Sequence, residues 1–334
     1  MKYVDDISRI IDAVKIISPN SFSFAGKTFT ANAGIPYQSN GSKAINPLVQ
    51  LLTDVLYQHC YCKKFDGTYY ESPVMKDNKE NFQAALSRAN STIERWDKDW
   101  IIEQILPTGQ YVALKNGKYR LLYPGEFITT EYQSALPHQG THITIQCLKE
   151  SFTLQPAFYF AFSNEIGEQQ NLNTVIRFYW NITSAGACRL IELLTNYLNK
   201  YTIPFSFKCL NNSALFTRSD AAVLYVSKPY YNITAQILTF VYPQIKSELK
   251  SEVPGFTKEL NAGLGLAEDP GTGESFGMSR CEMIAQGIYN GHHLGTISNE
   301  KMIDQVKEVF NARGIQINKP YLNEGSQDIY EVID

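Results

Sequence analysis

Hydrophobic positions recur at helical spacing through much of the first 105 residues. Apolar side chains three or four positions apart predict one helix from Val4 to Ile17. The same spacing predicts a second helix from Pro47 to Tyr61 and a third from Asn81 to Trp96. A stretch rich in Gly, Asn and Ser, Ala31 to Asn46, predicts a loop between the first two. We therefore expect residues 1–105 to form a mainly helical N-terminal subdomain.

After about residue 105 the pattern changes to short runs of alternating or apolar residues. Two such runs, Tyr111–Leu114 and Lys118–Tyr123, flank Asn116-Gly117, which is a strong signal for a β-hairpin. Strands and helices then follow one another without a strict βαβ rhythm, which favours an α+β fold. Residues 106–334 are expected to form one such domain, with helices packed on a mixed, largely antiparallel sheet. Further strands are expected at residues 143–147, 157–162, 174–182, 204–210 and 222–226, and helices at 184–201, 230–249, 280–289 and 299–313.

The composition narrows the class of protein. Hydrophobic residues make up 44% of the 334, enough for a large core, which excludes a disordered chain. The 30 Lys and Arg against 33 Asp and Glu give a net charge of −3, so we expect no nucleic-acid partner. No apolar run is long enough for a membrane span, so no membrane partner is expected either. The six cysteines are scattered and no secretion signal is recognisable, which favours a cytoplasmic protein.

The short motifs indicate neither a metal nor a cofactor. His59 adjoins Cys60 and Cys62, but their spacing differs from that of zinc ligands and no second pair follows. The glycine patterns that bind nucleotide phosphates, G-x-x-x-x-G-K-[ST] and G-x-G-x-x-G, are missing, which disfavours an ATP-using enzyme. The five histidines fall in polar or loop segments, and His292 and His293 are expected in a surface loop.

An arginine interrupts the apolar strand expected at residues 174–182. Alternation puts Arg177 and Tyr179 on one face of the sheet and Phe178 on the other. An unpaired charge is costly to bury, so Arg177 must face water, a carboxylate or a ligand. An exposed sheet face, a buried ion pair and a ligand-binding role all stay open at this point.

The strand at residues 204–210 carries a lysine in a similar setting. Phe205 and Phe207 are expected in the core, with Ser206 and Lys208 on the opposite face. Nearby cations or desolvation lower the pKa of a lysine, which makes Lys208 a candidate general base. The alternative is a solvated lysine whose aliphatic stem is buried.

Other cations follow at strand ends and in loops. Arg218 stands two residues before Asp220, so the two either form an ion pair or face a common ligand. A converging set of Arg and Lys suits a dianionic group such as a phosphate. The candidate cations are Arg177, Lys208, Arg218, Lys228, Lys258 and Arg280.

Several segments that contain these residues resemble the HopA-type effector family. The resemblance extends from about residue 80 to residue 332 and is greatest to free-standing bacterial members, notably cyanobacterial ones. The segments that carry it are Arg177-Phe-Tyr-Trp-Asn-Ile182, Ile203-Pro-Phe-Ser-Phe-Lys208, Arg218-Ser-Asp-Ala-Ala-Val-Leu-Tyr225, Val253-Pro-Gly-Phe-Thr-Lys258, Gly263-Leu-Gly-Leu-Ala-Glu268, Glu274-Ser-Phe-Gly-Met-Ser-Arg280 and Lys319-Pro-Tyr-Leu-Asn323.

The resemblance implies two alternative functions. Proteins with this domain serve as the lyase component in gene clusters for class V lanthipeptides and thioamitides. There, a kinase-like partner phosphorylates Ser or Thr of a precursor peptide, and the lyase eliminates phosphate to give dehydroalanine or dehydrobutyrine. A phosphorylated precursor peptide, a kinase-like protein and a cyclase are then the expected partners. Pathogen effectors of the family instead trigger plant immunity, so a non-catalytic peptide- or protein-binding module is the alternative.

Metal-independent elimination suggests a role for each candidate residue. Lys208 is the expected base that removes the Cα proton. Asp220 is expected to orient Arg218 or Lys208, and Tyr179 or Tyr225 to donate a proton. Cations hold the phosphate and stabilise its departure. The expected phosphate and substrate contacts are Arg177, Arg218, Lys228, Lys258 and Arg280.

Overall fold

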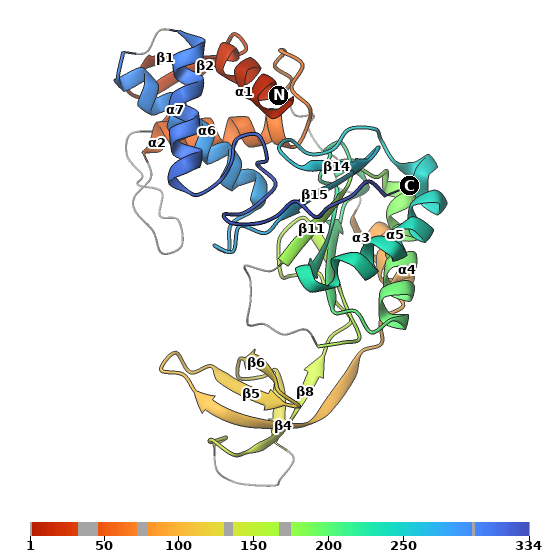
Figure 1. Cartoon of the computed structure of the whole chain (residues 1–334). Coiled ribbons are helices and arrows are strands. Elements are labelled where there is room, and N and C mark those ends of the chain that lie inside the picture. Colours follow the sequence, from red (N-terminus) through yellow and green to blue (C-terminus); the bar gives the residue numbers. More distant parts are fainter. Residues whose placement is uncertain are drawn as a thin grey trace.

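Helices and three antiparallel sheets combine into the α+β fold that the sequence predicts (Figure 1). The seven-stranded sheet lies in the middle, the five-stranded sheet at one end, and the three-stranded sheet with a group of helices at the other (Figure 1). Most of the loop expected at residues 31–46 lies outside the described residues. The computed structural model describes residues 2–32, 46–71, 79–129, 136–166, 175–295 and 298–333.

The first helix is shorter than its apolar spacing predicts. α1 (Lys2–Ala13) is followed by a three-stranded sheet of β1 (Val14–Ser18), β2 (Ser21–Phe24) and β3 (Lys27–Thr30). The helix predicted to reach Ile17 is wrong in its last turn, because Val14–Ser18 pairs with β2. The β-branched residues of this segment suit an extended strand, and the next segment supplies its hydrogen-bonding partner.

The second predicted helix is present and ends in a π-helical turn. α2 (Pro47–Leu56) begins at the Asn46 cap, whose side-chain oxygen accepts the N–H of Leu48 at 2.8 Å. The π-helical turn η1 (Tyr57–Tyr61) continues it directly. π-Helical turns are rare and often occur at functional sites, which draws attention to this segment.

The third predicted helix ends earlier than expected. α3 spans Lys79–Ala89 and does not reach Trp96, which lies in the strand β4 (Arg95–Ile105). The Asn90 side chain accepts the N–H of Thr92 at 2.9 Å. Such a local side-chain bond competes with helical hydrogen bonding and ends the helix.

A small five-stranded sheet has the strand order β6-β5-β4-β8-β7. It contains the predicted hairpin, with Asn116 and Gly117 both at positive φ in its turn. The strands besides β4 are β5 (Tyr111–Lys115), β6 (Lys118–Leu122), β7 (Phe127–Thr129) and β8 (His142–Cys147). Its core is formed by Trp100, Ile102, Ala113, Leu122, Ile143 and Ile145.

The central sheet has the strand order β14-β15-β11-β13-β12-β10-β9, with every neighbouring pair antiparallel. The apolar pattern did not predict β14 and β15, since Gly263 and Gly265 interrupt it. The strands are β9 (Glu150–Ser151), β10 (Phe158–Phe162), β11 (Val175–Trp180), β12 (Phe205–Leu210), β13 (Ala222–Ser227), β14 (Lys258–Asn261) and β15 (Leu264–Glu268).

Two helices cover one face of the central sheet. α4 (Ser184–Lys200) and α5 (Tyr231–Ile245) lie beside each other on this face (Figure 1). The ring of Phe178 on β11 stacks against Tyr231 of α5, with centroids 6.3 Å apart. Short 3₁₀ turns precede and follow α5 and connect β12 to β13; they are η3 (Ser213–Leu215), η4 (Lys228–Tyr230) and η5 (Lys246–Glu248).

The helices at the end of the molecule that holds the three-stranded sheet contact the central sheet on the face that α4 and α5 leave uncovered, near β11. α6 (Phe276–His293) begins there, and α7 (Asn299–Ala312) packs so closely on it that a Cβ at Gly287 would meet Val306. His292 and His293 lie in the last turn of α6, so their prediction as loop residues is wrong. None of the described helices is long and apolar enough to span a membrane.

The strand β4 ends at Ile105, where the sequence places a subdomain boundary. β4 pairs with both β5 and β8, so the five-stranded sheet draws strands from both sides of that position. The division of the chain into residues 1–105 and 106–334 stays a prediction.

Candidate functional site

Three adjacent strands bring predicted site residues onto one face of the central sheet. Arg177 on β11 lies opposite Tyr225 on β13, and Tyr225 lies opposite Ser206 on β12. Because side chains alternate along a strand, Tyr179 and Lys208 share this face with them. We call the face formed by Arg177, Tyr179, Ser206, Lys208 and Tyr225 the Lys208 face.

The ammonium group of Lys208 has no carboxylate partner in the part of the chain that the structure describes. Its Nζ donates to Gln155 Oε1 at 3.1 Å and lies 4.4 Å from the ring centroid of Phe158. The Tyr225 ring centroid is 5.8 Å away. Burial, and then the positive charge of Arg177, lower the pKa of Lys208 to about 8. A usable fraction of Lys208 is therefore neutral near neutral pH and able to accept a proton.

Arg177 forms a buried ion pair, one of the three alternatives open from the sequence. Its Nη2 lies 2.5 Å from Asp269 Oδ2, its Nε donates to the same oxygen at 2.7 Å, and Nη2 also donates to the Glu274 carbonyl at 3.0 Å. The guanidinium lies 5.4 Å from the Tyr225 ring centroid. Burial alone lowers the pKa of Arg177, but the neighbouring tyrosines and the Asp269 carboxylate raise it above its ordinary value. Arg177 therefore stays charged.

Arg218 and Asp220 form the ion pair that their spacing suggested. Nε and Nη2 of Arg218 bind the two carboxylate oxygens of Asp220 at 2.5 and 2.6 Å. Nη2 of Arg218 also donates to the hydroxyl of Tyr57 at 2.7 Å, and its guanidinium lies over the Tyr57 ring. Asp220 was predicted to orient either Arg218 or Lys208, and it binds Arg218. The positive charge of Arg218 also contributes to the lowered pKa of Lys208.

The two predicted proton donors both keep their protons. Tyr179 is 2% exposed, and its hydroxyl makes no hydrogen bond within the described residues. Its ring lies near Tyr61 of η1 and Phe276 of α6. Burial raises the pKa of Tyr179 and of Tyr225. Each is therefore a neutral phenol beside the cations of the Lys208 face.

Lys228 and Lys258 do not join the Lys208 face. Lys228 Nζ donates to Glu268 Oε1 at 2.6 Å, and Lys258 Nζ donates to Asp328 Oδ1 at 2.7 Å. Glu268 lies opposite Ile176, and the side chain of Ile176 points to the face opposite that of Arg177. The Lys228–Glu268 pair therefore lies on the face of the sheet away from Lys208. Both lysines contact the C-terminal segment, which they hold against the sheet.

Arg280 is also occupied elsewhere. It is 1% exposed, and its Nε and Nη2 donate to the carbonyl oxygens of Pro320 and Leu322 at 2.7 and 3.4 Å. Burial lowers the pKa of Arg280 to about 10. Its guanidinium therefore fixes the segment after α7 to α6, and the structure does not bring it to Lys208.

A cleft of about 650 Å³ adjoins the Lys208 face. Ser206 and Tyr225 line it from the central sheet, and Arg120 and Gln146 line it from the five-stranded sheet. The cleft also reaches Leu154, the neighbour of the residue that accepts the Lys208 hydrogen bond. Lys208 itself does not line the cleft, but its neighbours Ser206 and Tyr225 on the same face do, and the space is large enough for a ligand.

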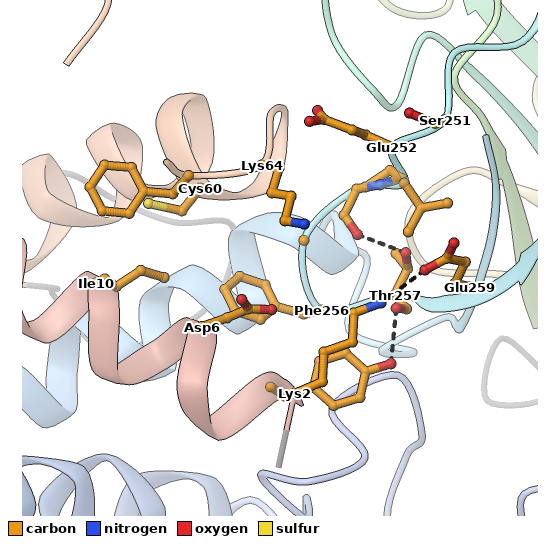
Figure 2. Close-up of a pocket in the computed structure, with 15 residues that line it drawn as sticks. Lys2, Asp6, Ile10, Cys60, Lys64, Ser251, Glu252, Phe256, Thr257 and Glu259 are labelled. Atoms are coloured by element: carbon orange, nitrogen blue, oxygen red, sulfur yellow. Dashed lines mark hydrogen bonds and ion pairs between the residues drawn. The ribbon is translucent and has the colours of Figure 1, made fainter. Parts of the chain in front are cut away.

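A second cavity of about 280 Å³ lies between α1 and the segment before β14 (Figure 2). It contains none of the predicted site residues, and Lys2 at its edge pairs with Glu259 (Figure 2). Cys60 lines this cavity as a buried, free thiol. No group of three or more His, Cys, Asp or Glu is placed to hold a metal ion within the described residues.

The arrangement on the Lys208 face suits proton transfer next to an anion. It combines a lysine of lowered pKa with the charged guanidinium of Arg177 and two neutral phenols, and Arg218 is a second charged guanidinium near the face. Within the described residues, Nη1 of Arg177 and Nη1 of Arg218 make no hydrogen bond, so each arginine keeps donors for a ligand.

The sequence did not reveal Tyr57, Gln155 or Asp269 as members of the site. Tyr57 is 161 positions from Arg218, and Asp269 is 92 positions from Arg177, so no local pattern links them. The available signal was indirect, because Tyr57 and Tyr61 recur at helical spacing on a stripe that is otherwise aliphatic.

Solved structures and one family model match this chain. The solved structures that match include two effector proteins from Pseudomonas syringae. That of pathovar tomato strain DC3000 is 14% identical, with 86% of this chain and 92% of that chain covered and a TM-score of 0.47. That of pathovar syringae strain 61 is 13% identical, with coverages of 83% and 96% and a TM-score of 0.45. No curated protein matches the sequence.

The family assignment depends on the sequence match. The HopA1 effector protein family matches residues 149–322, which is more than half of the 334 residues. This span contains β9 to β15, and with them Arg177, Lys208, Arg218 and Tyr225. Tyr57 and Arg120 lie outside it. The chain belongs to the HopA1 effector protein family.

Proposed function

We propose that this protein is a phosphoserine/phosphothreonine lyase that eliminates phosphate from a phosphorylated precursor peptide. The observation that carries the proposal is Lys208, a lysine with a pKa of about 8 and no carboxylate partner in the described chain. It stands beside two charged arginines and a cleft of about 650 Å³. A base next to an anion-binding group is what such an elimination requires.

The proposed reaction is a β-elimination. Neutral Lys208 Nζ takes the proton from Cα of the phosphorylated residue, and the electron pair forms the Cα–Cβ double bond. The bond between Cβ and the phosphate oxygen breaks, and phosphate leaves with that bonding pair. Phosphoserine gives dehydroalanine and phosphothreonine gives dehydrobutyrine. No metal takes part in this scheme.

Arg177 and Arg218 are the proposed phosphate contacts, through the donors that their ion pairs leave unused. Asp269 and Asp220 fix the two guanidiniums in place without consuming Nη1. Tyr225, between Arg177 and Lys208, is the proposed proton donor to the leaving phosphate. Tyr179 is the second candidate for that role, since its buried hydroxyl makes no hydrogen bond within the described residues.

The substrate defines the expected partners. A kinase-like protein has to phosphorylate the precursor peptide first, and a cyclase uses the dehydroamino acid afterwards. These steps would take place in the cytoplasm, where a kinase has access to ATP. The precursor peptide, the kinase-like protein and the cyclase are therefore proposed partners.

The second candidate function is a non-catalytic peptide- or protein-binding module of the effector type. The observation that favours it is that both site arginines are already paired, Arg177 with Asp269 and Arg218 with Asp220. Paired carboxylates reduce the net positive charge available to a phosphate. On this alternative the cleft binds a peptide without changing it.

Mass spectrometry of a phosphoserine peptide after incubation separates these functions. A lyase gives a product lighter by one phosphoric acid. A phosphatase gives serine, which is one water heavier than dehydroalanine, and a binding module returns the peptide unchanged. Lys208→Ala is expected to abolish the lyase product, while the exposed Lys200→Ala control retains it. Unchanged peptide with the wild-type protein, in the presence of measurable binding, contradicts the lyase proposal.

A further inference from the structure

One arginine in the cleft has no part in the proposed chemistry. Arg120 lies on β6 and lines the cleft between the five-stranded and the central sheet. Its position in the sheet is opposite Ala113, a residue of the small core, so Arg120 lies on the inner face. The Nε atom of Arg120 is buried and makes no hydrogen bond within the described residues. Arg120 also forms no ion pair with any of these residues.

The other charged side chains that line the cleft have partners. Glu126 accepts the N–H of Tyr123 at 2.9 Å, and a carboxylate oxygen of Glu165 lies 3.8 Å from Lys118 Nζ. A buried donor without a partner is costly, and a guanidinium is well shaped to bind a carboxylate or a phosphate. The cleft therefore offers one unused cationic group, and its chemistry matches an anion.

The cleft meets the Lys208 face at Ser206 and Tyr225, which line it, whereas Lys208 and Arg177 do not. Ser206 lines the cleft and lies two residues from Lys208 on the same face of β12. Leu154 lines it as well and adjoins Gln155, which accepts the Lys208 hydrogen bond. A chain whose reacting residue lies at Lys208 would therefore continue into the space that Arg120 lines.

We propose that the cleft binds an extended segment of the substrate peptide and that Arg120 pairs with an acidic side chain near the reacting residue. The identity of the reacting residue rests on the proposed function. The five-stranded sheet then acts as a specificity element that selects acidic sequences on one side of the phosphorylated residue.

The test uses peptides that bind but do not react. Each is a short, labelled Gly/Ala peptide with a central α-methylphosphoserine, which lacks the Cα proton and cannot be eliminated. One Asp is moved through the positions on either side, and the Kd of the full-length protein is measured by fluorescence anisotropy. We expect Asp at one or two adjacent positions to tighten binding about tenfold, the size of a charge-assisted hydrogen bond.

Variants of Arg120 separate recognition from a structural role. Arg120→Gln is expected to lose the preference for Asp and to keep its affinity for the peptide without Asp. Arg120→Glu is expected to prefer Lys at the same position, an exchange that loss of folding does not produce. Lys98→Gln, an exposed change on β4 outside the cleft, is the matched control and retains the preference for Asp.

The outcomes distinguish this inference from the proposed function. Equal Kd values for peptides with and without Asp, no binding of any peptide, or a preference that survives Arg120→Gln would each overturn it. An Arg120-dependent preference supports it, even if the corresponding phosphoserine peptides are not eliminated. Elimination without such a preference leaves the lyase proposal standing and refutes the role of Arg120.

Discussion

Lys208 differs from several other lysines of the described chain in what surrounds it. Lys115, Lys228 and Lys258 each contact a carboxylate, which stabilises the charged ammonium. Lys208 lies instead over the Phe158 ring and near two arginines, surroundings that favour the neutral amine. Its chemistry therefore depends on residues from other strands and loops.

This environment predicts how Lys208 affects stability at different pH. Its pKa is about 8 in the folded protein against an ordinary value of 10.5, so the unfolded chain holds the proton more tightly. The charged form costs stability fully below pH 8, and the cost falls as the pH rises toward 10.5. Lys208→Met is therefore expected to be more stable than the wild type at pH 7, with a difference that shrinks by pH 10. Urea unfolding at both values checks this, and a constant difference would argue against the lowered pKa.

Tyr57 offers a second test at the scale of one residue. Tyr57→Phe removes the hydroxyl that binds Arg218 and keeps the ring beneath the guanidinium. We expect elimination to slow about threefold to tenfold, because Arg218 becomes less well fixed, with about 1 kcal/mol or less lost in stability. Steady-state kinetics and urea unfolding measure the two effects. Tyr201→Phe, at an exposed site, is the control, and equal rates for the two variants would exclude a positioning role for Tyr57.

At the scale of elements, the sequence predicts helices and strands most accurately where a single hydrophobic periodicity continues through the whole element. The helix at Ser184–Lys200 and the hairpin at Asn116-Gly117 were predicted nearly to the residue. The errors lie where periodicities overlap. Val14 and Ile17 fit a helix by spacing, but pairing with β2 makes their segment a strand. The missed hairpin of β14 and β15 forms because β11 offers it an edge, which no local pattern contains.

The junction of α6 with the segment after α7 depends on Arg280. Arg280→Met leaves the carbonyl groups of Pro320 and Leu322 without their donor in a buried place. We expect a loss of about 2–3 kcal/mol in the free energy of unfolding, the size of hydrogen bonds to a charged group. Urea unfolding measures it, with the exposed Arg313→Met as control. Unchanged stability together with lost elimination would instead restore Arg280 as a phosphate contact.

At the scale of the molecule, the sequence predicts the class of the fold and part of the site. Because side chains alternate along a strand, the sequence alone predicts that Arg177 and Tyr179 share one face of the sheet, as do Ser206 and Lys208. The spacing of Arg218 and Asp220 likewise suggests their ion pair. The sheet order, which makes β11, β13 and β12 neighbours, is a property of the whole fold. That order separates the candidate cations into those beside Lys208 and those, such as Lys228, that hold the C-terminal segment.

The cleft is likewise a property of the whole molecule. It forms between two sheets whose strands come from residues 95–147 and 150–268, so no single segment contains it. Ser206 and Arg120 approach it from these two sheets, although neither is distinctive in the sequence. A cleft at a sheet-to-sheet boundary is the kind of feature that only the assembled fold shows.

The pH dependence of phosphate release tests the role of Lys208 most directly. Release from a phosphoserine peptide is measured between pH 6 and pH 10 for the wild type and for Lys208→Ala. The wild-type rate is predicted to rise with pH and level off above about 8, since only the neutral amine accepts the Cα proton. Lys208→Ala is predicted to be at least about a hundredfold slower and to lack that rise. Equal rates and equal pH profiles for the two proteins would contradict the account.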